Sequence, residues 1–364
     1  MQVSLSLTDV VQRSGVSSLA IVGTAKNVGK TVTMNYLAAE LSARGLTVGL
    51  ISSGRDGETV DSFTGEPKPS VVPPEGAWVA TAEGTLTNVA GSLEIVDVLE
   101  KPGLLGRLVL GRVVEPSPME LVGPGSAKEL GAIVGCLLQL GSDLVLVDGA
   151  LDRIAAASPA VTEGLILVTG ASAHDSLTAI AHEAGNLAWL WQRPEPPTVE
   201  VRQLAKQVIE DGYVAFLDED RTLGEKRRYK LRGTRHKTAL GHEEDILSDA
   251  GNAVFVVVPG AVTSKFLSLS ASWPEKEGFA VIARDPACIF AKSDPGVKLY
   301  VQDPANLLAV TVNPVSYRGV QQDPRQSVFS VHRAVSQATG KAIPVFDVVS
   351  GESSEKGVSE VALG

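Results

Sequence analysis

The stretch Gly23-Thr-Ala-Lys-Asn-Val-Gly-Lys-Thr31 decides how this chain is interpreted. The apolar run Ser18-Leu-Ala-Ile-Val22 precedes it and has the composition of a buried parallel strand. Residues 31–44 follow it, with apolar side chains that suit a helix packed by one face on a sheet. The sequence therefore predicts a strand, a glycine-bounded loop and a helix, in that order.

This order, with Gly-Lys-Thr at the end of the loop, is the P-loop arrangement. The backbone N–H groups of such a loop and the positive end of the helix dipole favour an anion at one point. We expect Lys30 to reach the β- and γ-phosphates of ATP and the Thr31 hydroxyl to bind Mg²⁺. A chance Gly-Lys-Thr in an ordinary turn is the alternative. The residues expected around the nucleotide are Gly23, Thr24, Asn27, Val28, Gly29, Lys30, Thr31 and Val32.

The loop departs from the common spacing in an informative way. Five residues separate Gly23 from Gly29, where four separate the two glycines of the common motif. The layout resembles the P-loop of dethiobiotin synthetase and its relatives, which belong to the same broad class as the MinD, ParA and nitrogenase-iron-protein ATPases. Many members of that class have a signature lysine five residues before the loop lysine. Lys26 lies four residues before Lys30, so we do not assign it that role.

Two carboxylates are candidates for the same site. Asp148 closes the apolar run 143–148, at the carboxyl edge of a predicted parallel strand, where ligands bind in open α/β sheets. We expect it to hold Mg²⁺, directly or through a water, because Mg²⁺ prefers oxygen ligands. Asp56 follows the predicted strand 47–53, and we expect it to position the attacking water or to sense the γ-phosphate, with Glu58 as the second choice. The alternatives are a turn-capping aspartate and a solvated charged turn.

Other polar segments near predicted strand ends have two interpretations each. Asp152 and Arg153 could couple the nucleotide state to a partner surface or simply pair with each other. Residues 122–126 could form a second anion site, although a plain turn is favoured. Residues 169–172 could line the nucleotide site. Asn313 could contact adenine, as an asparagine after a late strand does in some relatives, or merely begin an Asn-Pro turn.

Strands and helices alternate along most of the chain, which predicts an α/β fold with a doubly wound, mainly parallel sheet. We expect a P-loop NTPase domain over residues 1–192, ended by a proline-rich break. A C-terminal α/β region is predicted over residues 198–350, with a charged insertion near 217–245. Residues 351–364 are predicted to be a flexible tail.

Composition narrows the class of protein. The chain has 364 residues, 44% of them hydrophobic, and a formal net charge of −10, which argues against a general binder of nucleic acids or anionic membranes. The basic run 226–237 is interpreted as a solvated loop paired with nearby acidic residues, with a docking site for an acidic partner as the alternative. The two cysteines lack metal spacing, and no apolar run is long enough to span a bilayer. We therefore expect a cytoplasmic protein.

Four segments in sequence order resemble one family. They are Gly-Thr-Ala-Lys-Asn-Val-Gly-Lys-Thr from residue 23, Ser-Ser-Gly-Arg-Asp-Gly-Glu from residue 52, Val-Asp-Gly-Ala-Leu-Asp-Arg from residue 147 and Val-Thr-Gly-Ala from residue 168. Over about residues 18–172 the chain looks like the KamB subunit family of lysine aminomutase reactivases. The resemblance implies an ATP-dependent factor that exchanges damaged cobalamin on an adenosylcobalamin-dependent aminomutase, together with a MutS-like second subunit. It transfers roles only to Gly23, Lys30, Thr31, Asp56 and Asp148.

Two other functions remain open at this point. The first is an ATP-dependent ligase like dethiobiotin synthetase, although those enzymes are shorter and tend to have Glu-Gly-Ala-Gly-Gly where this chain has Asp148-Gly-Ala-Leu-Asp. The second is a nucleotide-binding scaffold with little turnover. A homodimer that shares an interfacial nucleotide is common in this class of P-loop proteins.

Overall fold

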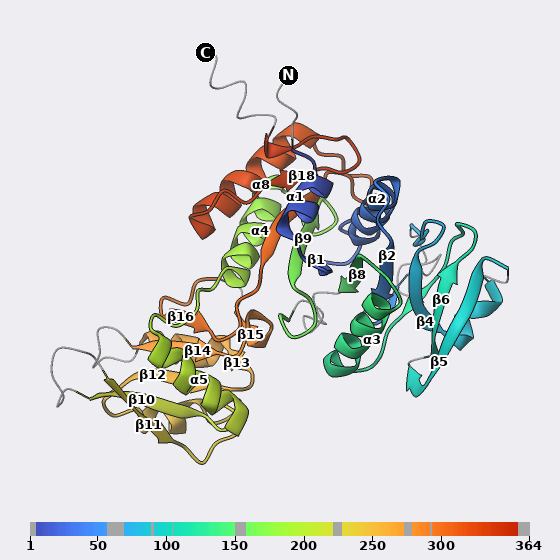
Figure 1. The fold of residues 1–364 in the computed structure, drawn as a ribbon. Coiled ribbons are helices and arrows are strands. Elements are labelled where there is room, and N and C mark those ends of the chain that lie inside the picture. Colours follow the sequence, from blue (N-terminus) through green and yellow to red (C-terminus); the bar gives the residue numbers. More distant parts are fainter. Residues whose placement is uncertain are drawn as a thin grey trace. The chain divides into compact units, whose positions relative to one another are not determined.

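The computed structural model describes residues 5–56, 69–88, 91–103, 105–149, 158–220, 228–272, 279–291 and 293–355. The chain divides into two compact units. Unit 1 comprises Met1–Gly185 and Asn306–Gly364, and unit 2 comprises Asn186–Ala305. Figure 1 shows the elements of both units in sequence colours.

Unit 1 contains a nine-stranded, mostly parallel sheet. Its strands from β18 to β4 pair in parallel with their neighbours, and the last two pairings are antiparallel. The α/β class predicted from the sequence is therefore confirmed. In spatial order the strands are β18 (Val345–Phe346), β17 (Leu307–Asn313), β9 (Gly164–Gly170), β1 (Ser18–Gly23), β8 (Leu144–Gly149), β2 (Val48–Ser52), β4 (Trp78–Ala82), β6 (Gly106–Val113) and β5 (Leu93–Gly103).

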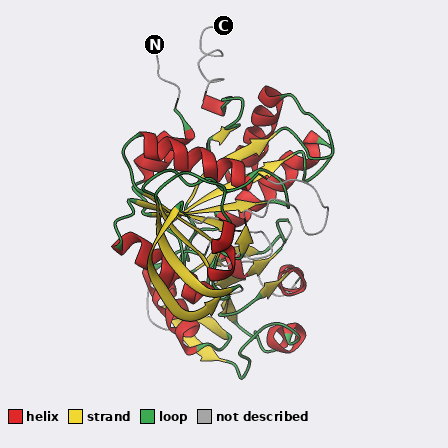
Figure 2. Ribbon diagram, turned by 90° about the vertical axis from the view of Figure 1, so that its right-hand side faces the viewer, coloured by secondary structure: helices red, strands yellow, loops and turns green. Residues whose placement is uncertain are grey.

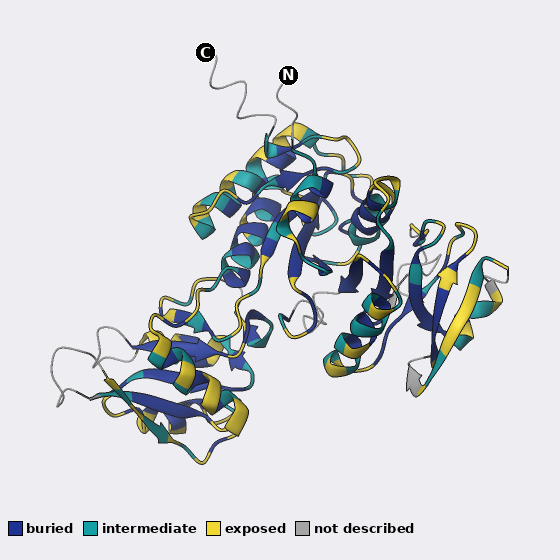
Figure 3. Ribbon diagram, in the orientation of Figure 1, coloured by how far each residue is buried: buried dark blue, intermediate teal, exposed yellow. Residues whose placement is uncertain are grey.

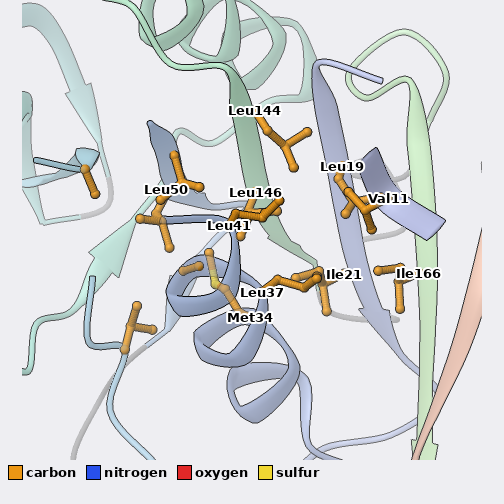
Figure 4. Close-up of a cluster of buried hydrophobic side chains, with 14 of the residues drawn as sticks. Val11, Leu19, Ile21, Met34, Leu37, Leu41, Leu50, Leu144, Leu146 and Ile166 are labelled. Atoms are coloured by element: carbon orange, nitrogen blue, oxygen red, sulfur yellow. The ribbon is translucent and has the colours of Figure 1, made fainter. Parts of the chain in front are cut away.

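Apolar side chains cover both faces of this sheet. On one face, Met34 and Leu37 of α2 (Lys30–Ala43) pack in the same cluster as Ile21 of β1 (Figure 4), which also includes residues of α1 (Leu7–Ser14). On the other face, Val145 and Val147 of β8 pack with α3 (Ala127–Gln139). Burial on both faces explains why the central strands are continuous apolar runs in the sequence.

The remaining helices of unit 1 are α8 (Pro324–Thr339) and most of α4 (Leu177–Trp191), which continues into unit 2. A Cβ placed on Gly185 of α4 would lie 3.1 Å from the carbonyl oxygen of Ala334, so α4 and α8 approach closely. Two short strands, β3 (Arg55–Asp56) and β7 (Leu121–Val122), pair outside the main sheet, and a 3₁₀ helix spans Glu83–Asn88. No helix among the described residues has the length and apolarity needed to cross a membrane.

Helix α1 is fixed at its N-terminus by a capping box. The Asp9 N–H donates to the Oγ of Ser6 at 3.1 Å, and the Ser6 N–H donates to the Oδ2 of Asp9 at 2.9 Å. Arg44, just after α2, pairs with the Oδ1 of Asp9 at 2.7 Å. The hydrogen bonds from Ser6, followed by that from Arg44, hold the pKa of Asp9 well below its usual range. Asp9 is therefore most stabilising when ionised.

Unit 2 contains a mixed five-stranded sheet in the order β11 (Arg228–Gly233), β10 (Ala215–Asp220), β12 (Ala253–Val258), β14 (Ala280–Ala283) and β16 (Lys298–Val301). Strands β12, β14 and β16 are parallel, and β10 is antiparallel to both of its neighbours. Strands β12 and β14 are almost wholly buried, whereas parts of α5 (Val199–Asp211) are exposed (Figure 3). The remaining elements of unit 2 are α6 (Glu243–Ser248), α7 (Ser264–Ala271), a two-stranded sheet of β13 (Val262–Thr263) and β15 (Ile289–Phe290), and a 3₁₀ helix at Pro286–Cys288.

The division of the chain differs from the predicted one. Instead of two consecutive domains over 1–192 and 198–350, unit 2 is inserted between α4 and β17, and β17 joins the first sheet beside β9. The predicted insertion near 217–245 also contains regular structure, namely most of β10, all of β11 and the start of α6. Figure 2 shows strands gathered into sheets with helices outside them. Of the predicted tail, residues 356–364 lie outside the described residues.

Candidate functional site

The loop between β1 and α2 has a backbone conformation that few sequences allow. Strand β1 ends at Gly23 and α2 begins at Lys30, which confirms the predicted strand–loop–helix order. Gly29 precedes the helix with φ at 105°, in the left-handed region that favours glycine. Asn27 has φ at 58° and is the sole non-glycine residue with positive φ in the described part of the chain. We call residues 24–29 the β1–α2 loop.

Gly23 is needed because the β1–α2 loop folds back over it. A Cβ at this position would lie 2.8 Å from Cγ2 of Val28, 3.0 Å from Cγ of Lys30 and 3.1 Å from the carbonyl oxygen of Ala25. Real side chains almost never tolerate the first of these distances. The loop is therefore a tight turn that holds the stem of Lys30 above the end of β1.

The start of the β1–α2 loop is fastened to the neighbouring strand β9. The Thr24 N–H donates to the carbonyl oxygen of Val168 at 2.8 Å, and its hydroxyl donates to the Oγ1 of Thr169 at 3.2 Å. Both threonines are buried. Thr169 therefore supports the loop by accepting this hydrogen bond, a contact that the sequence did not indicate, and the prediction that residues 169–172 line the nucleotide site stays a prediction.

The N-terminus of α2 has no side-chain cap among the described residues. Gly29 occupies the capping position and has no oxygen to offer, so the first N–H groups of this 14-residue helix are available to an external acceptor. Lys30, Thr31 and Val32 form that first turn and are all partly exposed. The available backbone N–H groups and the positive end of the helix dipole therefore coincide at the N-terminus of α2.

Asp148 lies at the carboxyl end of β8, directly beside β1. In the parallel register it is opposite Ile21 of β1 and Ser52 of β2, and its side chain is fully buried. Its carbonyl oxygen accepts a hydrogen bond from the Ser53 N–H at 2.8 Å. The carboxylate therefore lies near the carboxyl end of a central strand. The β1–α2 loop begins at this same end of the sheet.

Oxygen donors are the ligands that Mg²⁺ prefers, so the Thr31 hydroxyl and the Asp148 carboxylate fit this ion chemically. Among the described residues, no group of three or more His, Cys, Asp or Glu side chains is placed to hold a metal by itself. Mg²⁺ at nucleotide sites commonly uses one or two protein ligands and completes its shell with phosphates and waters. Thr31 and Asp148 would be the two protein ligands of such a site.

Asp56 is placed by the structure on an element that the sequence did not predict. The sequence suggested a position after the strand 47–53, with a solvated charged turn as the alternative, but Arg55–Asp56 forms β3, which pairs antiparallel with Leu121–Val122 of β7. The Gly123 N–H donates to the carbonyl oxygen of Gly54 at 2.7 Å, which holds the start of this segment. The side chain of Asp56 lies outside what the structure describes, so its role stays a prediction.

Of the secondary candidates for the site, the structure describes residues 122–126. Ser126 accepts a hydrogen bond from the Glu129 N–H at 3.3 Å and so caps α3, which favours a structural role for residues 122–126 over a second anion site. Glu58, Asp152 and Arg153 lie outside the described residues. Their predicted roles stay predictions.

The middle of the basic run 226–237 forms β11, where acidic residues of β10 face it. Arg232 forms a bidentate pair with Asp218 at 2.8 and 3.0 Å, and Lys230 is opposite Asp218 in the register. The hydrogen bonds to Asp218 raise the pKa of Arg232 above its usual range. The predicted pairing with acidic residues is therefore confirmed for Arg232, but the predicted solvated loop is wrong over Arg228–Gly233, which form a strand.

Asn313, at the carboxyl end of β17, contacts the β1–α2 loop. A Cβ placed on Gly29 would lie 3.1 Å from Cβ and 3.3 Å from Nδ2 of Asn313. The Oδ1 of Asn313 accepts a hydrogen bond from the Val315 N–H at 3.1 Å, and its carbonyl oxygen accepts one from the Ala171 N–H at 2.9 Å. The sequence singled out this residue without indicating that it touches the loop.

Comparison of the chain with protein-family models, with curated proteins and with solved structures found no match.

Proposed function

We propose that this protein binds a Mg²⁺–nucleoside triphosphate at the β1–α2 loop and hydrolyses it as a P-loop NTPase. The observation that carries the proposal is the combination of a glycine-tight loop with an uncapped helix N-terminus. Gly23 leaves no room for a side chain, Gly29 adopts a left-handed conformation, and α2 begins without a side-chain cap. A triphosphate is the anion that would use all of these donors.

Each residue of the proposed site has a separate task. Lys30 would pair with the β- and γ-phosphates, and its stem is already held over Gly23. Thr31 and Asp148 would hold Mg²⁺, which neutralises phosphate charge when it is bound. Asp56 would position the water that attacks the γ-phosphate. Most of the catalysis would then come from positioning and from charge stabilisation.

The buried position of Asp148 favours a metal-bound nucleotide over an anion site of another kind. A binding loop for sulfate or a simple phosphate needs no carboxylate beside it, since a bare carboxylate would repel the anion. A metal-bound triphosphate does need one, because the carboxylate holds the ion between protein and phosphates. Asp148 on the strand next to β1 thus supports a metal-bound nucleotide.

The biological setting that we propose rests on the resemblance to lysine aminomutase reactivases. In that setting, ATP turnover would drive exchange of damaged cobalamin on an adenosylcobalamin-dependent aminomutase, with a MutS-like second subunit. A hydrolysis-dependent change at the nucleotide loops would alter the grip on that partner. The ligase alternative differs in one respect that can be measured, because a ligase consumes ATP only when its small acceptor is present.

The test is phosphate release from Mg-ATP by the purified full-length chain without any acceptor. We expect turnover by the wild type and a loss on the order of 100-fold in Lys30→Ala. Lys128→Ala is the matched control, since Lys128 lies in the first turn of α3, a helix whose N-terminus Ser126 already caps. Equal turnover by wild type and Lys30→Ala would contradict the site. Turnover that appears in the wild type only after a small carboxylate or amine acceptor is added would favour the ligase.

A further inference from the structure

Asn313 contacts the β1–α2 loop at Gly29, where the backbone adopts a conformation that favours glycine. Gly29 has φ at 105°, and the three atoms nearest to a Cβ placed there are the Cβ, Nδ2 and Cγ of Asn313, at 3.1 to 3.6 Å. The next residue along the chain is Lys30, the first residue of α2. The side chain of Asn313 therefore limits where Gly29 can move, and with it the first helical N–H groups.

Asn313 is itself held rigidly from three directions. Its Oδ1 accepts the Val315 N–H, and its carbonyl oxygen accepts the Ala171 N–H. Gly170 lies opposite it in the register, and a Cβ on Gly170 would be 2.4 Å from the carbonyl oxygen of Asn313. The backbone of Asn313 is thus held against the segment that follows β9 and its side-chain amide is oriented by Val315, so Asn313 can act as a fixed wall for the residue it contacts.

The first turn of α2 has a second link to the same strand. The hydroxyls of Thr33 and Thr311 are 3.1 Å apart and hydrogen-bonded, and both residues are almost fully buried. Strand β17 thus contacts the end of the β1–α2 loop through Asn313 and the start of α2 through Thr311. The beginning of the loop is fastened separately, by Thr24 to strand β9.

We propose that Asn313 is a positioning residue of the phosphate site: it holds Gly29 so that the N–H groups at the start of α2 and Lys30 converge on the triphosphate. This inference rests on the proposed function. It assigns Asn313 an effect on phosphate binding that does not depend on which base the nucleotide carries. A residue that instead contacts the base would leave the binding of a base-free polyphosphate unchanged.

The experiment compares three probes by isothermal titration of the full-length chain: Mg-ATP, Mg-GTP and Mg-tripolyphosphate, which has no base. We expect Asn313→Ala to weaken all three by the same factor, about tenfold, because the loop loses its wall while every base contact stays. Asn313→Asp keeps the shape but places a negative charge beside the anion. Because the wall is retained, we expect it to weaken all three probes only by charge repulsion, so that its affinities approach those of the wild type at high salt.

Asn306→Ala is the matched control, since Asn306 immediately precedes the opposite end of the same strand and is exposed. It should bind all three probes like the wild type. Thermal unfolding of each variant separates loss of the fold from loss of the loop geometry, and the isosteric Asn313→Asp keeps the test decisive if Asn313→Ala does not fold.

Two results would overturn the inference while leaving the proposed function intact. One is weaker ATP binding by Asn313→Ala with unchanged tripolyphosphate binding, which would make Asn313 a base contact. The other is wild-type affinity of Asn313→Ala for all three probes. If the wild type binds none of the probes and Lys30→Ala behaves identically, the proposed function fails as well, and that outcome differs from both of the others.

Discussion

Both units contain parallel strands with polar residues at their carboxyl ends, but the two sets of strand ends are used differently. In unit 2, the N–H groups that follow β14 and β16 are consumed locally. Asp285 accepts a hydrogen bond from the Cys288 N–H, and the Asp303 N–H donates to the carbonyl oxygen of Arg284 at 2.8 Å. In unit 1, the turn after β1 leads into a helix with no side-chain cap.

The difference shows what a ligand site requires in addition to a position at the carboxyl ends of parallel strands. The rule that ligands bind at the carboxyl ends of parallel strands applies to both units. In unit 1, the tight loop formed with Gly23 and Gly29 leads directly from a strand end into α2, whose N-terminus has no side-chain cap among the described residues. In unit 2, Asp285 instead caps a short 3₁₀ helix and so satisfies its own turn.

The largest effect on nucleotide affinity is expected at Gly23, where a substitution tests whether the tight loop of unit 1 forms part of a ligand site. Gly23→Ala would put a Cβ 2.8 Å from Cγ2 of Val28 and 3.0 Å from Cγ of Lys30, so the loop must move. We expect Mg-ATP affinity, measured by titration, to fall by about 100-fold, since small displacements at such sites have large consequences. Stability should fall by about 1–3 kcal/mol from overpacking.

Gly135→Ala provides the control for that substitution. Gly135 lies inside α3, and a Cβ there would meet nothing within 4 Å. This variant should bind Mg-ATP normally and gain about 0.5–1 kcal/mol of stability, because alanine favours the helix more than glycine does. Unchanged nucleotide affinity in Gly23→Ala would show that the tight turn is not part of a phosphate site.

A smaller effect is expected at Asp9 of unit 1. Its pKa is lowered by hydrogen bonds from Ser6 and then by Arg44, so the ionised form stabilises the fold. Asp9→Asn should lower the free energy of unfolding by about 1 kcal/mol at pH 7, as for the loss of a helix cap. Because the folded pKa is depressed, this contribution is present above about pH 4, the unfolded value, and disappears as the pH falls further. Urea unfolding of the wild type and of Asp9→Asn at pH 7 and pH 3 measures this contribution. An equal difference in unfolding free energy between the two proteins at both pH values would contradict the capping account.

The smallest effect, with the opposite sign, is expected at Asp303 of unit 2. Burial, followed by the charge of Asp285, raises the pKa of Asp303, so its ionised form costs stability. Asp303→Asn should raise the free energy of unfolding at pH 7 by less than about 0.5 kcal/mol, since the residue is exposed and solvent screens the charge. The wild type should reach the stability of the variant as the pH drops through the raised pKa of Asp303 to its unfolded value. Destabilisation by Asp303→Asn at pH 7 would show that the carboxylate is needed in its turn.

The strands and helices around the site follow from local sequence. The apolar runs at 18–22 and 143–148 predict β1 and β8 to within one residue, because buried parallel strands need continuous apolar side chains. Gly23, at the end of β1, and Gly29, at the end of the β1–α2 loop, likewise mark positions where a side chain would not fit. These features depend on a few neighbouring residues, so a single sequence contains them.

The parts that sequence could not supply depend on distant segments. Strand β17 is an apolar run like any other, and nothing in it indicates that it pairs with β9 across the inserted unit 2. The contact of Asn313 with Gly29 follows only from that pairing. Strands β10 and β11 were missed for a different reason, because charged residues such as Asp218 and Arg232 suggest a loop until their pairing across the two strands is seen.

The most direct test of the central claim is the titration of Mg-ATP into three proteins: the wild type, Lys30→Ala and Lys128→Ala. The two lysines both lie in the first turn of a helix of unit 1, but α2 has no side-chain cap and α3 is capped by Ser126. We predict saturable binding by the wild type and by Lys128→Ala, and no measurable binding by Lys30→Ala. Identical isotherms for Lys30→Ala and the wild type would contradict the account, because nucleotide would then bind somewhere other than the β1–α2 loop.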